Sequence, residues 1–235
     1  MLPLLLLSTF SLTSATDPGC IPRHSASLGF HLRVNITSPS DFTPSINLHY
    51  LSTAHIGPAQ NRAIISPSPG PVFYQNGTYS DITFHTLSIL TDAGSPPGVF
   101  PEAITYLPDD ANNSSAVYIN AGLPGSGTSL SRLWDPYSYL TILEGVVEST
   151  FVVCNRTIPY YGENKWFNVV NWVQATRDGT GTHIKIPEGC VAVNLIPECA
   201  FLEELPEGAY SSHEFAQEVR CYEDVGEIEW WRYSF

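Results

Sequence analysis

The amino-acid sequence predicts an all-β protein, built as a single-domain sandwich or barrel with a short C-terminal helix. Short runs in which apolar and polar residues alternate recur along the chain, as they do in half-buried strands. Turn-forming residues separate these runs, and the chain contains 17 glycines and 19 prolines. Hydrophobic residues make up 43% of the sequence, which is ample for a packed core. A β-trefoil is an alternative, although no convincing threefold repeat supports it.

The expected strands begin at residues 30–36, where Phe30, Leu32 and Val34 alternate with polar neighbours. Their regular spacing, with turn residues between them, is typical of β-sandwiches and β-barrels. The other expected strands are 46–51, 63–65, 72–74, 82–90, 103–106, 116–119, 150–154, 166–173, 183–186 and 191–196.

One helix is expected near the C-terminus. Residues 211–214 have the spacing of a capping box, and Phe215, Val219 and Tyr222 would then share one helical face. We therefore expect an all-β domain over residues 16–197, with an acidic extension over residues 198–235 packed on it.

Residues 1–15 have the features of a secretory signal peptide. Met1 to Leu7 is almost uninterrupted leucine, and the small residues Thr13 and Ala15 precede a turn. A buried helix or a membrane anchor is the alternative, but the apolar run is shorter than the ~20 residues of a membrane span. We expect cleavage of this leader and a secreted, extracellular protein in an oxidising environment.

Acceptor motifs for N-linked glycosylation agree with a secreted protein. Asparagine followed two residues later by serine or threonine is the acceptor pattern. It occurs at Asn35, Asn76, Asn112, Asn113 and Asn155, and the adjacent pair is expected to carry one glycan. Some of these asparagines are expected to be buried or unused.

The five cysteines predict two disulfides. No C-x-x-C motif is present, so neither a redox motif nor a zinc knuckle is indicated. Our first choice pairs Cys154 with Cys190 and Cys199 with Cys221, leaving Cys20 near the new N-terminus. Other pairings stay open, because sequence alone does not fix connectivity.

The charge balance restricts the partners of the protein. The formal net charge is -13, so nucleic acids and anionic membrane surfaces should repel the chain. Much of the acidic charge falls in the last forty residues, which is typical of a solvated face. A glycan or an extracellular protein is the expected partner, and the oligomeric state is not predicted.

The sequence motifs argue against several catalytic activities. The glycine-rich segment 122–129 lacks the lysine of a phosphate-binding loop. His213-Glu214 resembles the start of a zinc-protease helix, but Gln217 replaces the second histidine. We expect no metal, no cofactor and no catalytic residue that the sequence can identify. A hydrolase that uses a carboxylate pair stays open as an alternative.

Aromatic residues are the best indication of binding. Exposed rings can stack on the apolar faces of sugars, and Tyr160, Tyr161 and Trp166 lie in or beside an expected loop. Packing in the core is the alternative role for any single ring. These three residues are our candidate ligand-binding site.

Several short motifs give the chain a resemblance to a known group of proteins. In sequence order they are 30–34, 55–57, 63–65, 73–78, 117–122, 151–154 and 190–197. On these motifs the chain resembles small secreted proteins of filamentous ascomycete fungi that carry a domain of unknown function. The resemblance implies an all-β, secreted protein without an established enzymatic role. The paired cysteines of that family would correspond to Cys154 and Cys190, whereas the acidic tail with Cys199 and Cys221 departs from the pattern.

These observations together predict a non-enzymatic binding protein of the cell surface or host interface, with a glycan or a protein as ligand. An unrecognised secreted hydrolase is one alternative. The other is a structural wall protein cross-linked through Cys20.

Overall fold

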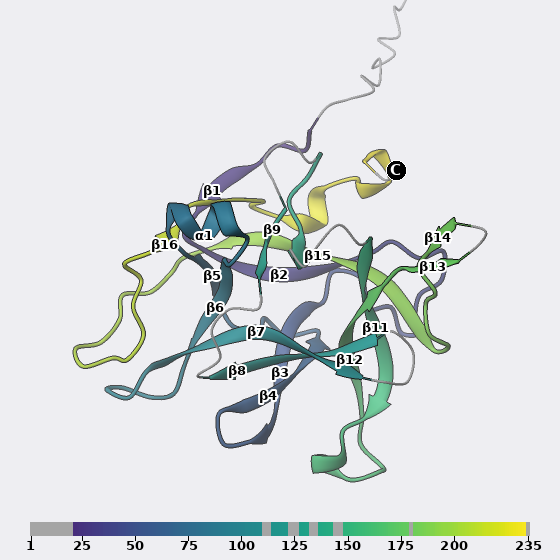
Figure 1. Cartoon of the computed structure of the whole chain (residues 1–235), viewed down its shortest axis with the longest axis horizontal. Helices are drawn as coiled ribbons and strands as arrows, with labels where there is room; N and C mark the ends of the chain where they lie inside the picture. Colours follow the sequence, from purple (N-terminus) through teal and green to yellow (C-terminus); the bar gives the residue numbers. More distant parts are fainter. Residues whose placement is uncertain are drawn as a thin grey trace, which may run out of the picture.

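The computed structural model confirms the all-β prediction and identifies the architecture as a nine-stranded closed barrel (Figure 1). It describes residues 21–109, 114–121, 127–131, 136–142, 148–178 and 181–233. The expected leader, Cys20, Asn112 and Asn113 lie outside these residues. Of the architectures that the sequence left open, the barrel is the one observed, and the sandwich and the trefoil are not.

Successive strand pairings close the barrel. They run in the order β11, β15, β2, β5, β6, β7, β8, β4 and β12, and β12 pairs again with β11. All of these pairings are antiparallel. The strands are β2 (Gly29–Ile36), β4 (Gln60–Ser66), β5 (Phe73–Asn76), β6 (Ser88–Ala93), β7 (Phe100–Asp109), β8 (Ser114–Ala121), β11 (Ser149–Thr157), β12 (Trp166–Gln174) and β15 (Cys190–Ala200).

Further elements lie outside the nine-strand circuit of the barrel. β3 (Tyr50–Gly57) forms a hairpin with β4 and reaches β2 through one register pair. β16 (Ala216–Gln217) adds to β5. The remaining pairs are β1 (Ser25–Ser27) with β17 (Val219–Cys221), β9 (Thr128–Leu130) with β10 (Leu140–Ile142), and β13 (Thr176–Asp178) with β14 (Gly181–His183). The 3-10 turns are η1 (Pro159–Tyr161), η2 (Val225–Glu227) and η3 (Trp230–Arg232).

The single α-helix of the described residues is not where the sequence predicts it. The helix expected at residues 211–222 is wrong, because this segment forms β16 and β17 and the C-terminus contains only 3-10 turns. Of the expected apolar face, Val219 and Tyr222 are buried in cores, but they reach them from extended backbone, and Phe215 is half exposed. The observed helix is α1 (Tyr79–Phe84), which falls partly in an expected strand. Its capping box, Thr78 with Asp81, satisfies the first backbone amides.

Strand alternation produces two cores on opposite sides of the barrel wall. On β11 and β12, Val153 and Val170 point into the barrel with the main cluster. Val152 and Val169 point outward into a second cluster, which we call the side core. Burial on both faces explains why these strands read as apolar runs rather than as strict alternation.

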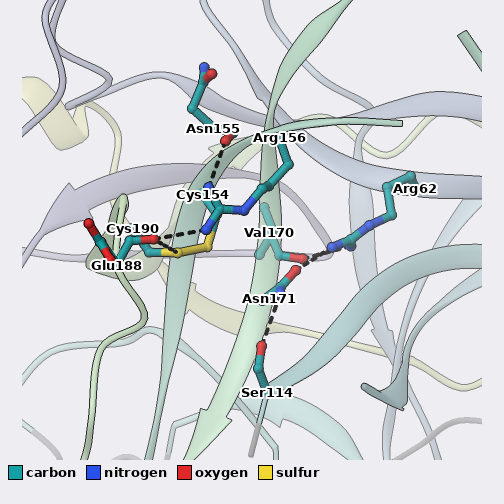
Figure 2. The surroundings of a disulfide bond; sticks show 9 residues. All are labelled: Arg62, Ser114, Cys154, Asn155, Arg156, Val170, Asn171, Glu188 and Cys190. Carbon is teal, nitrogen blue, oxygen red and sulfur yellow. Dashed lines mark hydrogen bonds between the residues drawn. A yellow bond between two sulfur atoms is a disulfide. The ribbon is translucent and has the colours of Figure 1, made fainter. Parts of the chain in front are cut away.

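A buried arginine joins β4, β8 and β12, which pair with one another in this part of the barrel wall. Arg62 on β4 donates Nη1 to the carbonyl oxygens of Val117 and Val170, the latter at 2.7 Å, and Nη2 to Oδ1 of Asn171. Asn171 Nδ2 in turn donates to Ser114 Oγ at 2.9 Å (Figure 2). Because β4 meets β8 and β12 at this point, these bonds hold the β11–β12 hairpin against the rest of the barrel.

Both expected disulfides are present. Cys154–Cys190 joins directly opposed residues of β11 and β15 (Figure 2), and Cys199–Cys221 joins β15 to β17. The second bridge ties the acidic tail to the barrel. In the described part of the chain, no helix is long and apolar enough to cross a membrane.

Candidate functional site

The turn between β11 and β12 carries two of the aromatic residues that the sequence selected. Pro159 begins η1 with a fixed φ, and Tyr161 N donates to Ile158 O at 2.9 Å. Gly162 ends the turn at a φ of 80°, a backbone conformation that favours glycine. The local sequence therefore holds Tyr160 and Tyr161 in a tight, defined turn.

The two tyrosines have different roles in this turn. Tyr161 packs on the side core, with its ring centroid 4.9 Å from that of Phe167, and Lys165 Nζ lies 4.6 Å from its ring. Tyr160 is 59% exposed and meets Tyr161 edge-on at 5.3 Å. Tyr161 thus fixes the turn, and Tyr160 presents its ring to solvent.

Trp166 does not join the two tyrosines. It is 61% exposed and begins β12, and its neighbour Phe167 points toward Tyr161. Because successive side chains of a strand point to opposite faces, Trp166 lies on the other side of the hairpin. There it shares its face with Asn168 and Asn155, whose side chains are bonded at 3.1 Å. The expected three-residue site is therefore divided between two faces.

Tyr160 instead lies beside a row of polar residues that the sequence analysis did not select. Its ring lies 5.8 Å from that of exposed His55 on β3. His55 is directly opposite Asn61 on β4, so the two side chains share a face. Asn61 Nδ2 lies 3.0 Å from each carboxylate oxygen of Glu102 on β7. We call Tyr160, His55, Asn61 and Glu102 the aromatic row.

Glu102 is the unusual member of the aromatic row. It is only 5% exposed, and burial raises the pKa of its carboxyl group. The hydrogen bonds from Asn61 and the nearby His55 oppose that shift of the pKa. The ionisable neighbour that acts on this carboxyl group is the His55 imidazole, whereas a glycoside hydrolase of the usual kind uses a second carboxyl group there.

The expected glycosylation sites differ in exposure. Asn155 is exposed near the end of β11, whereas Asn35 is 8% exposed and lies within β2 opposite Asn194. Asn76 is half-buried at the end of β5. Among the described acceptors, Asn155 therefore offers its side chain most freely.

The structure also places the His213-Glu214 motif and the glycine-rich segment that the sequence analysis considered. His213 Nε2 lies 2.8 Å from Asp92 Oδ2, an ion pair that fastens the tail to β6 when the histidine is protonated. Within the described residues, no three His, Cys, Asp or Glu side chains gather as a metal site would require. Residues 122–126 of the glycine-rich segment lie outside the described residues.

A family described as a domain of unknown function (DUF7907) matches residues 27–199. The chain belongs to this family. The match includes residues of all nine barrel strands and ends at Cys199, near the start of the acidic tail, where the tail's disulfide is attached. The DUF7907 assignment agrees with the domain of unknown function that the resemblance in the sequence implied.

A curated relative extends the similarity beyond the DUF7907 region. The chain is 39% identical over 216 residues to the antigenic protein SchS34 of Stachybotrys chartarum, covering 91% of this chain and 94% of that protein. The expectation of a fungal family of unknown function is thereby confirmed. No solved structure matches the chain.

Proposed function

We propose that this protein is a secreted, non-enzymatic glycoprotein that recognises carbohydrate through the aromatic row. The observation that carries the proposal is the juxtaposition of an exposed ring with planar polar groups. Tyr160 is positioned by a rigid turn beside His55, and Asn61 and Glu102 follow along the same face. A sugar offers an apolar face to such a ring and hydroxyl groups to such polar side chains.

The location outside the cell has two supporting observations. Two disulfides fit an oxidising compartment, and the relative's description as antigenic is compatible with an extracellular protein. Exposed Asn155 is the site at which we expect a glycan.

The test is binding of the purified secreted protein to fungal wall polysaccharides and their oligosaccharides, followed by mass spectrometry of the incubated ligands. Tyr160→Ala should weaken binding roughly tenfold, because stacking on the ring is lost. Tyr160→Phe should keep most of the affinity, because the ring remains. Intact ligand after incubation is expected.

Trp166→Ala is the matched control, since Trp166 is equally exposed but lies on the other face of the hairpin. It should change affinity by no more than about twofold. Loss of binding in Trp166→Ala but not in Tyr160→Ala would assign the site to the other face. Cleaved ligand would replace the binding role with a hydrolase.

Non-reducing electrophoresis of the same preparation tests the structural wall alternative. A monomer on non-reducing electrophoresis is expected, whereas a Cys20-linked oligomer that binds no saccharide would favour the wall protein. Peptide mapping should find a glycan on Asn155 and none on Asn35.

A further inference from the structure

A cavity lies beside α1, away from the aromatic row. It has a volume of about 590 Å³, within the range of small-molecule sites. Its walls come from α1 and the residues that follow it, from β9, and from the tail segment that contains β16 and β17. We call it the α1 cavity.

Hydrogen bonds between distant segments hold its walls together. Gln75 on β5 accepts from Leu130 N at 2.9 Å and donates to Gln217 Oε1 at 3.2 Å. Gln217 donates in turn to Gly77 O at 2.6 Å. These bonds join β5, β9, β16 and the start of α1, so the cavity is built by the fold rather than by one loop.

Most of the accessible surface of the lining is apolar, although polar and charged residues outnumber aliphatic ones in it. Four aliphatic side chains contribute, namely Ile82, Leu87, Leu130 and Val219. Ile82 is 45% exposed although it is aliphatic, and it lines the opening from α1. Exposed aliphatic surface in a concave site is what an apolar ligand would cover.

One buried polar group in the lining has no partner. Ser138 is 1% exposed, its backbone N donates to the Tyr222 hydroxyl at 2.9 Å, and its own hydroxyl oxygen has no hydrogen-bond partner among the described residues. A buried hydroxyl without a partner is unfavourable, and a ligand oxygen would satisfy it.

The charges of the lining are balanced. Glu218 and Arg220 both contribute, one of each sign, so the cavity offers no net attraction to a charged ligand beyond the acidic protein as a whole. Charge therefore favours an uncharged occupant.

We propose that the α1 cavity binds a neutral oxygenated hydrocarbon, with its apolar body against Ile82, Leu87, Leu130 and Val219 and its oxygen hydrogen-bonded to Ser138. This site is separate from the aromatic row and does not depend on carbohydrate binding. The class includes aliphatic and terpenoid alcohols and ketones of drug-like size.

The test uses the uncharged fluorophore 1-aminoanthracene as a reporter and four ten-carbon competitors: 1-decanol, decane, decanoate and decylamine. We expect the reporter to bind the intact secreted protein with increased fluorescence, and 1-decanol to displace it best. Stronger displacement by decanoate or decylamine would overturn the neutral class. A folded protein that does not bind the reporter would overturn the site.

Variants on α1 locate the binding. Ile82→Trp fills the opening and should weaken reporter binding about tenfold. Phe84→Trp is the control, because Phe84 is on the same helix, 74% exposed and outside the lining. Equal affinity of Ile82→Trp and wild type would place the reporter elsewhere and refute the proposal.

Ser138→Ala tests the polar contact. It should weaken 1-decanol roughly fivefold, the effect of one hydrogen bond, and leave decane unchanged. An unchanged affinity for 1-decanol would remove Ser138 from the site.

Discussion

The aromatic row and the α1 cavity offer a ligand opposite kinds of surface. The row is open and polar, with Tyr160 59% exposed and a carboxylate at its inner end. The cavity is recessed and its accessible surface is mostly apolar, and among the described residues the buried hydroxyl of Ser138 in its lining has no partner. An open ring with polar neighbours suits a hydrated sugar, whereas a recessed aliphatic wall suits a molecule that avoids water.

The two regions also depend on different supports. The row rests on the side core and the β11–β12 turn, near the Cys154–Cys190 bridge. The cavity takes a wall from the tail, which the Cys199–Cys221 bridge holds to β15. If the supports are separate, loss of each disulfide should weaken ligand binding mainly in the region that the disulfide supports.

Removal of the tail disulfide is the strongest test of this separation. The double substitution Cys199→Ser with Cys221→Ser should lower the free energy of unfolding by roughly 2–4 kcal/mol, because the unfolded chain loses a constraint. It should also weaken 1-aminoanthracene binding about fivefold or more, because β16 and β17 form a wall of the cavity. Urea unfolding and fluorescence titration measure the two effects.

The matched control removes the other bridge. Cys154→Ser with Cys190→Ser should cost similar stability but weaken saccharide binding rather than reporter binding, with both assays run where the variants remain folded. If each double variant impaired both ligands equally, the barrel and tail would behave as one cooperative unit, and the separation would be wrong.

The difference between the regions also explains what the sequence could predict. Tyr160 and Tyr161 are adjacent in a Pro-Gly turn, so their place in a loop follows from local rules. The alternation that divides Trp166 from them depends on where β12 begins. His55, Asn61 and Glu102 meet only through strand register, which a single sequence does not reveal.

The α1 cavity was less accessible to prediction. Its walls are up to 145 residues apart in the chain, from Gln75 to Arg220, and they meet only in the fold. The capping box at Thr78 was present in the sequence, yet the apolar residues of 82–90 favoured a strand. Residues 211–222 have a helical pattern but contain strands. The pairing of β17 with β1 and the disulfide between Cys221 and Cys199 override that pattern.

Ser138→Ala should separate stability from binding within the cavity. Removal of a buried hydroxyl that lacks a partner should raise the free energy of unfolding by about 1 kcal/mol in the absence of ligand. The same variant should bind 1-decanol less well. Urea unfolding with and without 1-decanol measures both effects, and a variant that is destabilised in the ligand-free state would show that the hydroxyl has a partner in solution.

Glu102→Gln should have a smaller effect, confined to the aromatic row and dependent on pH. Burial raises the pKa of Glu102 above the ordinary value of 4.5, so the folded protein retains this proton after the unfolded chain has released it. The contribution of Glu102 to stability is therefore greatest below pH 4.5 and declines as the pH rises through the folded-state pKa. Glutamine still accepts from Asn61 but does not titrate.

The stability of Glu102→Gln relative to wild type should consequently increase as the pH rises above about 4.5 and through the folded-state pKa, and then level off. Thermal unfolding across this range measures the trend, and Glu163→Gln in the exposed turn is a control that should show no such trend. Reporter binding in the α1 cavity should be the same in all three proteins. If the stability of Glu102→Gln relative to wild type fell with rising pH, the neighbours of Glu102 would stabilise its charged form. The aromatic row would then present a carboxylate to its ligand, not a carboxyl group whose ionisation the fold disfavours.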